Sequence, residues 1–155
     1  MSAHTSAVQD TLLQLKHEGK VRAIGTSIHN RPRAGQLAKK SAFDILMLRY
    51  NAAHPGIEGD VFSHFSTPKE CRINIVTYTA TNWRRLLKRP KKWNGRLMTA
   101  QDCYRFCLSH PHVDVVLNGP ANTQELYSNL NALEVGPLTA EENEWMRRFG
   151  AVVHG

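Results

Sequence analysis

The residues best suited to binding chemistry lie in the loop and helix that follow an apolar run at residues 113–117. Gly119 would let a phosphate approach the backbone closely. The helix expected to begin at Asn122 or Thr123 would offer free N–H groups and the positive end of its dipole to an anion. This combination predicts an anion site. The alternative is an ordinary strand-to-helix turn in which Asn122 or Thr123 serves only as the N-cap.

A second segment, residues 82–96, combines positive charge with indole rings. Lysines, arginines and exposed tryptophans are what a groove for single-stranded nucleic acid uses, since the ring stacks on a base while the charges meet phosphates. A solvated basic loop is the other interpretation. The net charge of +7 favours an anionic partner, such as a phosphorylated cofactor or nucleic acid. The basic residues are Arg84, Arg85, Lys88, Arg89, Lys91, Lys92 and Arg96, interleaved with Trp83 and Trp93.

Four strands are expected to position these loops. The run at residues 43–49 (FDILMLR) is almost continuously apolar, as expected of a parallel strand covered on both faces. The β-branched run at residues 73–78 predicts another strand. The remaining two are expected at residues 21–26 and 113–117.

Helices are expected between the strands. Apolar residues repeat at helical spacing over residues 7–17, and Gly19 then ends the helix. Thr139 and Glu142 have the spacing of a capping box at the start of the last helix. Four strands alternating with helices predict an α/β fold of parallel βα units joined by right-handed crossovers. The other helices are expected at residues 32–40, 57–65 (short), 99–108 and 123–133.

Length and composition bound the fold. At 155 residues the chain suffices for one domain but is shorter than the ~250 residues of a complete eight-stranded α/β barrel. Residues 1–9 lack the pattern of a secretory signal, and no run approaches the ~18 apolar residues of a membrane span. Cys71, Cys103 and Cys107 lack CxxC spacing and are expected to be reduced and packed in a cytoplasmic protein. A metal or redox role is the alternative, and no metal site is assigned.

Four segments, in order along the chain, resemble the last four strands of the aldo/keto reductase family. They are EGKVRAIGTSIHN (residues 18–30), LRYN (residues 48–51), VTY (residues 76–78) and VDVVLNGPANTQELYSNL (residues 113–130). The resemblance implies a single domain over residues 1–155 that forms the carboxy-terminal half of a TIM-type (β/α)8 barrel. It also implies an oxidoreductase family that uses NADPH.

The resemblance further implies a nicotinamide cofactor site. Tyr78 matches the aromatic residue that stacks on the nicotinamide ring, and Ser27 matches the serine that binds its carboxamide. Asn129 matches the asparagine that contacts the adenine. Glu125 stands where the family has Gln or Arg, and a glutamate would repel a 2′-phosphate, so the choice between NADP and NAD stays open. A tyrosine that is simply packed with its hydroxyl in water is the alternative for Tyr78.

Other positions extend or weaken this expected site. In the family the loop after the seventh strand folds over the cofactor pyrophosphate, which adds Arg84 and Arg85 to the expected cofactor residues and makes nucleic acid the less favoured partner. Ile28 stands where the family often has Asn, and Met47 where it commonly has Gln. Neither can make the family's hydrogen bonds to the carboxamide, so the ring would be held loosely.

No catalytic residue is assigned. The family's catalytic Asp, Tyr, Lys and His belong to the first four strands, and no segment of this chain matches them. His54 and His112 lie next to Pro55 and Pro111 in loop-like contexts and match no catalytic position. The expectation is therefore a reductase-like chain with little activity alone. The alternative is a non-catalytic binding or assembly module whose basic loop meets an anionic partner.

Four strands curved to fit a barrel would leave two open edges, at residues 21–26 and 113–117. Unpaired backbone at an edge recruits partners, and an exposed apolar inner face is rarely tolerated in a monomer. The sequence therefore predicts self-association, as a homodimer. The side chains expected on the inner face are Ile24, Leu46 or Met47, Val76 and Val115.

Overall fold

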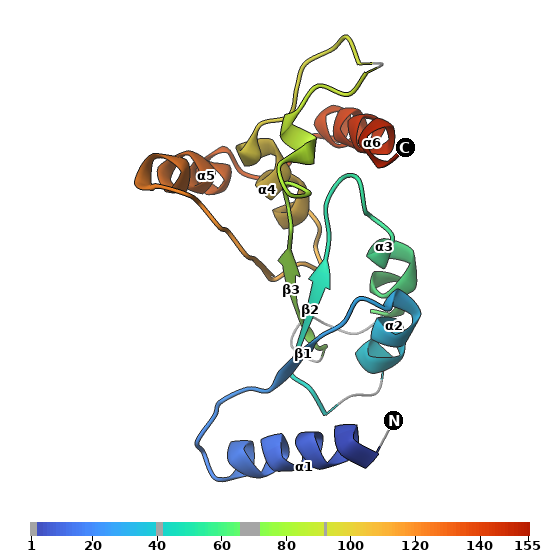
Figure 1. Cartoon of the computed structure of the whole chain (residues 1–155), viewed down its shortest axis with the longest axis vertical. Coiled ribbons are helices and arrows are strands. Elements are labelled where there is room, and N and C mark those ends of the chain that lie inside the picture. The colour runs from blue at the N-terminus through green and yellow to red at the C-terminus, as the bar shows by residue number, and fades with distance from the viewer. Residues whose placement is uncertain (1–2, 40–41, 66–71, 92) are drawn as a thin grey trace.

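A computed structural model describes residues 3–39, 42–65, 72–91 and 93–155, which form a four-stranded parallel sheet with helices between the strands (Figure 1). The strands lie in the order in which they occur along the chain, so each crossover joins neighbours. They are β1 (Gly25–Ser27), β2 (Ile45–Arg49), β3 (Asn74–Tyr78) and β4 (Val115–Val116).

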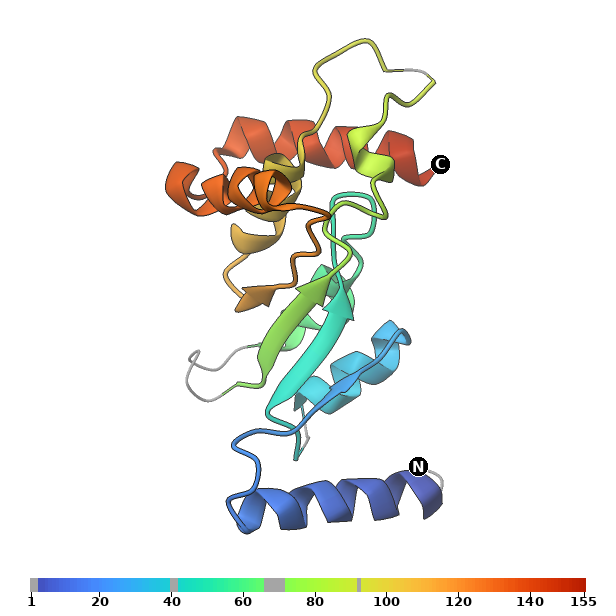
Figure 2. The ribbon, with the colours of Figure 1, turned by 60° about the vertical axis from the view of Figure 1, so that its left-hand side comes forward.

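The helices occupy the predicted intervals. Short 3-10 helices η1 (Phe62–His64) and η3 (Arg85–Leu87) follow α3 and β3. In Figure 2, α1 lies across one end of the molecule and α4 to α6 gather at the other. The α-helices are α1 (Ala3–His17), α2 (Arg31–Lys39), α3 (Ile57–Asp60), α4 (Ala100–Leu108), α5 (Thr123–Val135) and α6 (Ala140–His154).

Alternation along the strands divides the sheet into a buried and an open face. Leu46, Leu48, Ile75 and Thr77 are almost completely buried, and the first three belong to one apolar core with residues of α2, α3, α4 and α6. The intervening side chains face the other way. Met47 and Val76 are only half-buried there, and Val115 is 47% exposed. The core therefore lies on one side of the sheet.

Register fixes which open-face residues lie side by side. Ser27 pairs with Met47, Met47 with Val76, and Val76 with Val115, so these four form one layer across the sheet. Of the pair Leu46 or Met47 expected on this inner face, Met47 lies there and Leu46, the next residue along the strand, is buried on the other side. Ile24 was also expected there, and that prediction is wrong, because Ile24 precedes β1 and is buried.

The edge strands are shorter than predicted. The first was expected at residues 21–26 and the last at 113–117, but paired backbone spans only Gly25–Ser27 and Val115–Val116. Each edge strand has a neighbour on one side only, so it is a strand only where that neighbour runs alongside. The backbone before β1 is instead tied down by Asp44, whose Oδ2 accepts from the Ile24 N–H at 2.9 Å and from Lys16 Nζ at 2.8 Å.

The predicted capping box of the last helix is confirmed. Thr139 Oγ1 accepts from the Glu142 N–H at 3.2 Å, and the Glu142 carboxylate accepts from the Thr139 N–H at 2.9 Å. The same carboxylate receives two bonds from the buried Arg105 guanidinium, at 2.8 and 2.9 Å. Arg105 also donates to the carbonyls of Gly136 and Pro137. This cluster joins α4 to the start of α6.

The Arg105 cluster should make stability depend on pH. The bonds from Arg105 and the Thr139 N–H lower the pKa of Glu142 to about 2 from a usual value near 4.5. Its contribution is thus complete above pH 4.5 and is lost as pH falls toward 2. Glu142→Gln should cost about 1–2 kcal/mol of unfolding free energy at pH 7 and progressively less at lower pH.

Denaturant unfolding from pH 7 to pH 2.5 measures this difference. Glu141→Gln is the matched control, because Glu141 is exposed in the same first turn of α6. A stability gap for Glu142→Gln that stays constant over the whole range would contradict the assignment.

Candidate functional site

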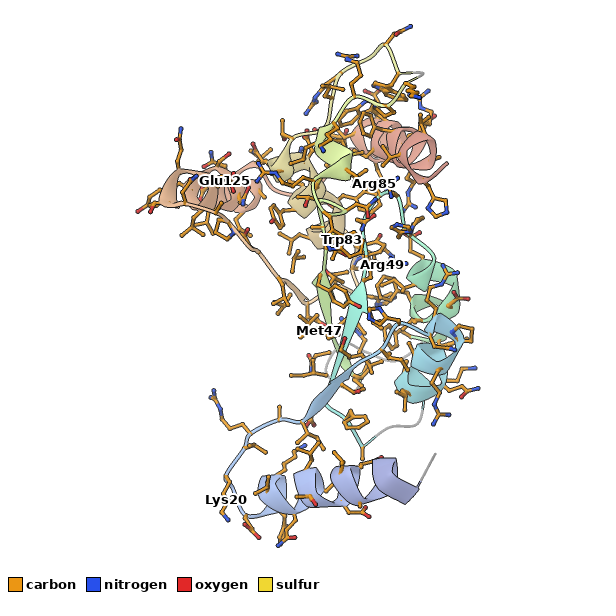
Figure 3. The ribbon with its side chains drawn as sticks, in the orientation of Figure 1. Lys20, Met47, Arg49, Trp83, Arg85 and Glu125 are labelled. Carbon is orange, nitrogen blue, oxygen red and sulfur yellow. The ribbon has the colours of Figure 1, made fainter. Side chains whose placement is uncertain are left out.

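The carboxyl ends of the four parallel strands meet at one edge of the sheet, which is where barrel folds place their ligands. β1 ends at Ser27, β2 at Arg49 and β3 at Tyr78, and Gly119 follows β4. Figure 3 shows Met47 on the sheet, Arg49 nearer this edge, and Glu125 beyond it on α5. The predicted cofactor residues therefore come from loops that leave the same edge.

Four of them line one cavity of about 160 Å³ between the loop after β3, the loop after β4 and helices α4 and α5. These four are Arg84, Gly119, Glu125 and Asn129. A Cβ placed on Gly119 would meet nothing within 4 Å, so no packing contact of the described residues requires glycine there. The other lining residues are Thr81, Leu87, Ala100, Tyr104 and Ser128.

Opposite charges face each other across this cavity. Arg84 donates to Glu125 Oε1 at 3.2 Å, from a side chain that is 65% exposed. The Ala121 N–H donates to Glu125 Oε2 at 3.0 Å. The pKa of Glu125 is lowered, first by the Ala121 N–H and then by Arg84. Glu125 is therefore ionised at neutral pH and holds the loop after β4 as well as the arginine.

The start of α5 is capped as the simpler interpretation expected. The Asn122 side chain accepts from the Glu125 N–H at 2.8 Å, and Asn122 has extended backbone. Asn122 is thus the N-cap and does not line the cavity. Asn129, which does, is buried and donates to Asn118 Oδ1 at 3.0 Å, fixing its amide against the loop after β4.

Arg84 is placed by a backbone that its residue types disfavour. Thr79, Asn82, Trp83 and Arg84 have φ angles of 56°, 49°, 52° and 65°, in the left-handed region that non-glycine residues rarely adopt. The amide of Asn82 is buried, and neither its nitrogen nor its oxygen has a hydrogen-bond partner among the described residues. Strain and an unpaired buried amide both cost free energy, and such costs cluster at binding sites.

Tyr78 and Ser27 belong to the open face of the sheet, outside this cavity. Ser27 is exposed in the layer of Met47, and Tyr78 lies one layer nearer the carboxyl edge, paired with Arg49. The Tyr78 hydroxyl and His29 Nδ1 are 3.2 Å apart, and the two rings meet edge to face. Tyr78 is half-buried, so one side of its ring is available to a ligand.

Arg85 points away from Arg84. Its guanidinium donates to the Val153 carbonyl of α6 at 3.4 Å, and it lines a different hollow with Lys88, Arg89 and Lys91. The left-handed turn at Arg84 separates the two adjacent arginines, and no pattern in the sequence predicts this turn.

The two tryptophans of the basic segment also differ. Trp93 stacks against Phe149 with ring centroids 5.0 Å apart and donates to the Arg96 carbonyl. Trp83 is 64% exposed. Of this pair, Trp83 alone offers a broad exposed ring for stacking, and Lys92, predicted as part of the basic set, lies outside the described residues.

The thiols that the structure describes are packed, as predicted. Cys103 and Cys107 are buried and free, and burial raises the pKa of Cys103 to about 12 and that of Cys107 further. Cys71 lies outside the described residues. Among the residues that are described, no group of three or more His, Cys, Asp or Glu side chains is arranged to hold a metal ion.

Sequence reasoning missed a second set of residues at the same edge. Arg49, His29, His54 and His154 line a larger cavity of about 540 Å³. Arg49 ends the apolar strand FDILMLR, and a charged residue closing a barrel strand faces the ligand-binding end. That position was the only hint available from the sequence.

No family model and no curated protein matches the chain. Solved structures do. An aldo-keto reductase from Bacillus halodurans in its holo form matches with a TM-score of 0.67 and 23% identity over 88% of this chain and 52% of that one. The fold is that of half an aldo-keto reductase barrel.

Two further aldo-keto reductase-type structures agree. A putative 2,5-diketo-D-gluconic acid reductase B has a TM-score of 0.64 and 22% identity, over 88% of this chain and 48% of its own. An aldo-keto reductase from a Medee basin deep-sea metagenome library has a TM-score of 0.67 and 17% identity, over 98% and 57%. The chain thus spans about half the length of the structures it matches.

The predicted fold class, parallel βα units forming half of a TIM-type barrel, is therefore confirmed. Within the described ranges, no helix is long and apolar enough to cross a membrane.

Proposed function

We propose that this chain is a nicotinamide dinucleotide-binding half of an aldo-keto reductase-type oxidoreductase and is its carboxy-terminal half. The observation that carries the proposal is the 160 Å³ cavity, which brings together Arg84, Gly119, Glu125 and Asn129 from three separate segments. All four were predicted as cofactor residues, three of them from the segment at residues 113–130 and Arg84 from the loop after β3. A bound dinucleotide would supply a hydride; the residues of this chain bind and orient it.

The cavity fits the adenosine end of such a cofactor. Asn129 offers an amide to the adenine, and the exposed backbone at Gly119 offers room for a phosphate. Glu125 already pairs with the Arg84 guanidinium, so a 2′-phosphate would have to compete with this carboxylate and would be repelled by its charge. NAD(H) is therefore proposed to bind at least as tightly as NADP(H).

Tyr78 is proposed to carry the nicotinamide ring at the other end. Its hydrogen bond to His29 fixes the orientation of the phenol, and the neighbouring open layer holds Ser27 for the carboxamide. Ile28 and Met47 bring apolar side chains to positions where hydrogen bonds would be needed. This arrangement supports binding of the ring better than it supports a closely defined hydride geometry.

The second part of the proposal is self-association. Val115 and Leu117 are exposed at 47% and 45% beside the unpaired edge of β4. On α5, Leu126, Leu130 and Leu133 recur at helical spacing and are all exposed. In a complete barrel this edge and helix would be covered, so a second copy of the chain is proposed to cover them here. Free, buried cysteines support the proposed cytoplasmic location.

The two adjacent arginines should contribute differently to cofactor affinity. Arg84→Ala is expected to weaken NADH binding about tenfold, because the side chain lines the cavity and holds Glu125. Arg85→Ala is the matched control: it removes the same charge one residue away, from a side chain turned toward α6. Fluorescence titration with NADH and NADPH measures both.

Equal weakening by the two variants would show that only net charge matters and would contradict the site. Tighter binding of a short single-stranded oligonucleotide than of either dinucleotide, with dependence on Trp83, would favour the nucleic-acid alternative instead. Glu125→Gln, which removes the repulsion, should improve NADPH relative to NADH.

Carbonyl reduction by the purified chain is expected to be very slow or undetectable. Positioned general acids contribute roughly 10²–10⁴-fold to such reactions, and no residue of this chain matches the family's acid. Turnover of aldehydes or ketones is measured by loss of NADH or NADPH absorbance. Ordinary enzymatic rates that fall on substitution of Tyr78 or Ser27 would contradict the expectation.

Self-association is expected at micromolar concentration. Sedimentation equilibrium should give a mass near twice 17.5 kDa. Leu130→Glu combined with Leu133→Glu should shift the chain to monomer, because both changes place charge on the exposed stripe of α5. Val152→Glu is the control, on an exposed position of α6. A single species of 17.5 kDa at high concentration would show that no second copy covers the edge.

A further inference from the structure

A second cavity, of about 540 Å³, lies between the carboxyl ends of β1 and β2 and helices α3 and α6. It shares no lining residue with the cavity of Arg84 and Glu125. No aspartate or glutamate of the described part of the chain lines it. Its polar lining consists of Arg31, Arg49, Arg147, His29, His54 and His154.

Two of the three arginines are held by carboxylates outside the cavity. Arg31 pairs with Asp60 at 3.1 Å, and Arg147 pairs with Glu58 at 2.7 Å. Arg49 is exposed at the end of β2, and its guanidinium makes no hydrogen bond or ion pair with any residue that the structure describes. The cavity therefore contains a positive charge that the described residues leave uncompensated.

Burial and the nearby positive charges both disfavour protonation of His54. The pKa of His54 is lowered, first by burial and then by Arg49, His154, Arg85 and Arg31. The rings of His54 and His154 also meet edge to face, with centroids 4.8 Å apart. Side chains from β2, α2 and α6 and from the loop after β2 thus converge with one sign of charge.

Two glycines allow segments that line this cavity to approach one another closely. A Cβ on Gly56 would lie inside the Arg31 guanidinium, so only glycine lets that arginine lie against the backbone at the start of α3. A Cβ on Gly150 would collide with the Ala52 carbonyl, so only glycine lets α6 approach the loop after β2. That approach brings Arg147 and His154 to the cavity. The Gly150 contact is between two packed backbone segments, whereas Gly56 meets the end of the Arg31 side chain, which is 54% exposed.

We propose that this cavity binds a small ligand bearing phosphate or carboxylate groups, at a site separate from the cavity of Arg84 and Glu125. Arg49 is its principal partner, with Arg31, Arg147 and the two histidines around it. A volume of about 540 Å³ is that of a small-molecule site and not of a polymer groove. Through His29 the ligand lies next to Tyr78, at the carboxyl edge of the sheet.

Calorimetric titration with inorganic phosphate and with citrate, at constant ionic strength in chloride, tests the site. Binding of at least one is expected in the millimolar range or tighter, and which one binds distinguishes phosphate from carboxylate ligands. Arg49→Gln should weaken it at least about tenfold. Arg148→Gln removes the same charge from a 66% exposed side chain outside this cavity and should leave affinity unchanged.

A second variant tests the site even if Arg49→Gln fails to fold. Ala151→Glu adds a carboxylate to the cavity wall at an exposed position of α6 and should abolish binding while the thermal unfolding curve is preserved. Absence of binding by both probes, equal loss with Arg148→Gln, or unchanged binding by Ala151→Glu would each overturn the proposal. Displacement of the anion by saturating NADH would also overturn it, since the cavity would then belong to the dinucleotide. The first three outcomes do not depend on whether Arg84 binds a cofactor, so they test this site separately from the proposed function.

Discussion

Four parallel strands cannot close on themselves, and this constraint underlies most features of the molecule. Side chains alternate across each strand, so a sheet with helices on one side has one buried face and one that needs a second cover. Leu46, Leu48 and Ile75 are covered by helices, whereas Met47, Val76 and Val115 are left partly or largely exposed. Both edge strands are also short, because each has one neighbour only.

The same open sheet explains why the candidate ligand sites lie at one edge. The strands are parallel, so all their carboxyl ends and following loops lie together, with Arg49 and Tyr78 at strand ends and Arg84 and Gly119 in the loops that follow. Four parallel strands therefore place their following loops side by side, as the strands of a full barrel do. What an open half does not provide is the opposite wall, which is why binding is a better-supported role than turnover.

Prediction from sequence succeeded where the determining interactions are local. The capping box of Thr139 and Glu142 and the N-cap of Asn122 depend on residues three apart, and both are present. The βα alternation followed from hydrophobic patterning and gave the fold. The inner face was harder, because the apolar run FDILMLR does not show which alternate set faces the helices, and Leu46 proved to be on the buried side.

Placement of the charged residues could not be predicted, because it depends on backbone turns and on contacts between distant segments. Arg84 and Arg85 are adjacent and chemically identical, yet a left-handed turn sends one to Glu125 and the other to α6. Arg49 meets His154 in one cavity only because Gly150 lets α6 approach the loop after β2. Residue spacing in the sequence predicts neither the left-handed turn nor the approach of α6.

The net charge of +7 does not show that the two cavities differ in how their positive charge is compensated. Near Arg84 the positive charge is compensated by Glu125, so that cavity is nearly neutral and selects a ligand by shape and hydrogen bonds. Around Arg49 it is not compensated by any described carboxylate in the lining, so that cavity selects by charge. The two cavities therefore differ in charge, and Tyr78 and His29, whose hydroxyl and Nδ1 atoms are 3.2 Å apart, lie at the carboxyl edge of the sheet that both adjoin.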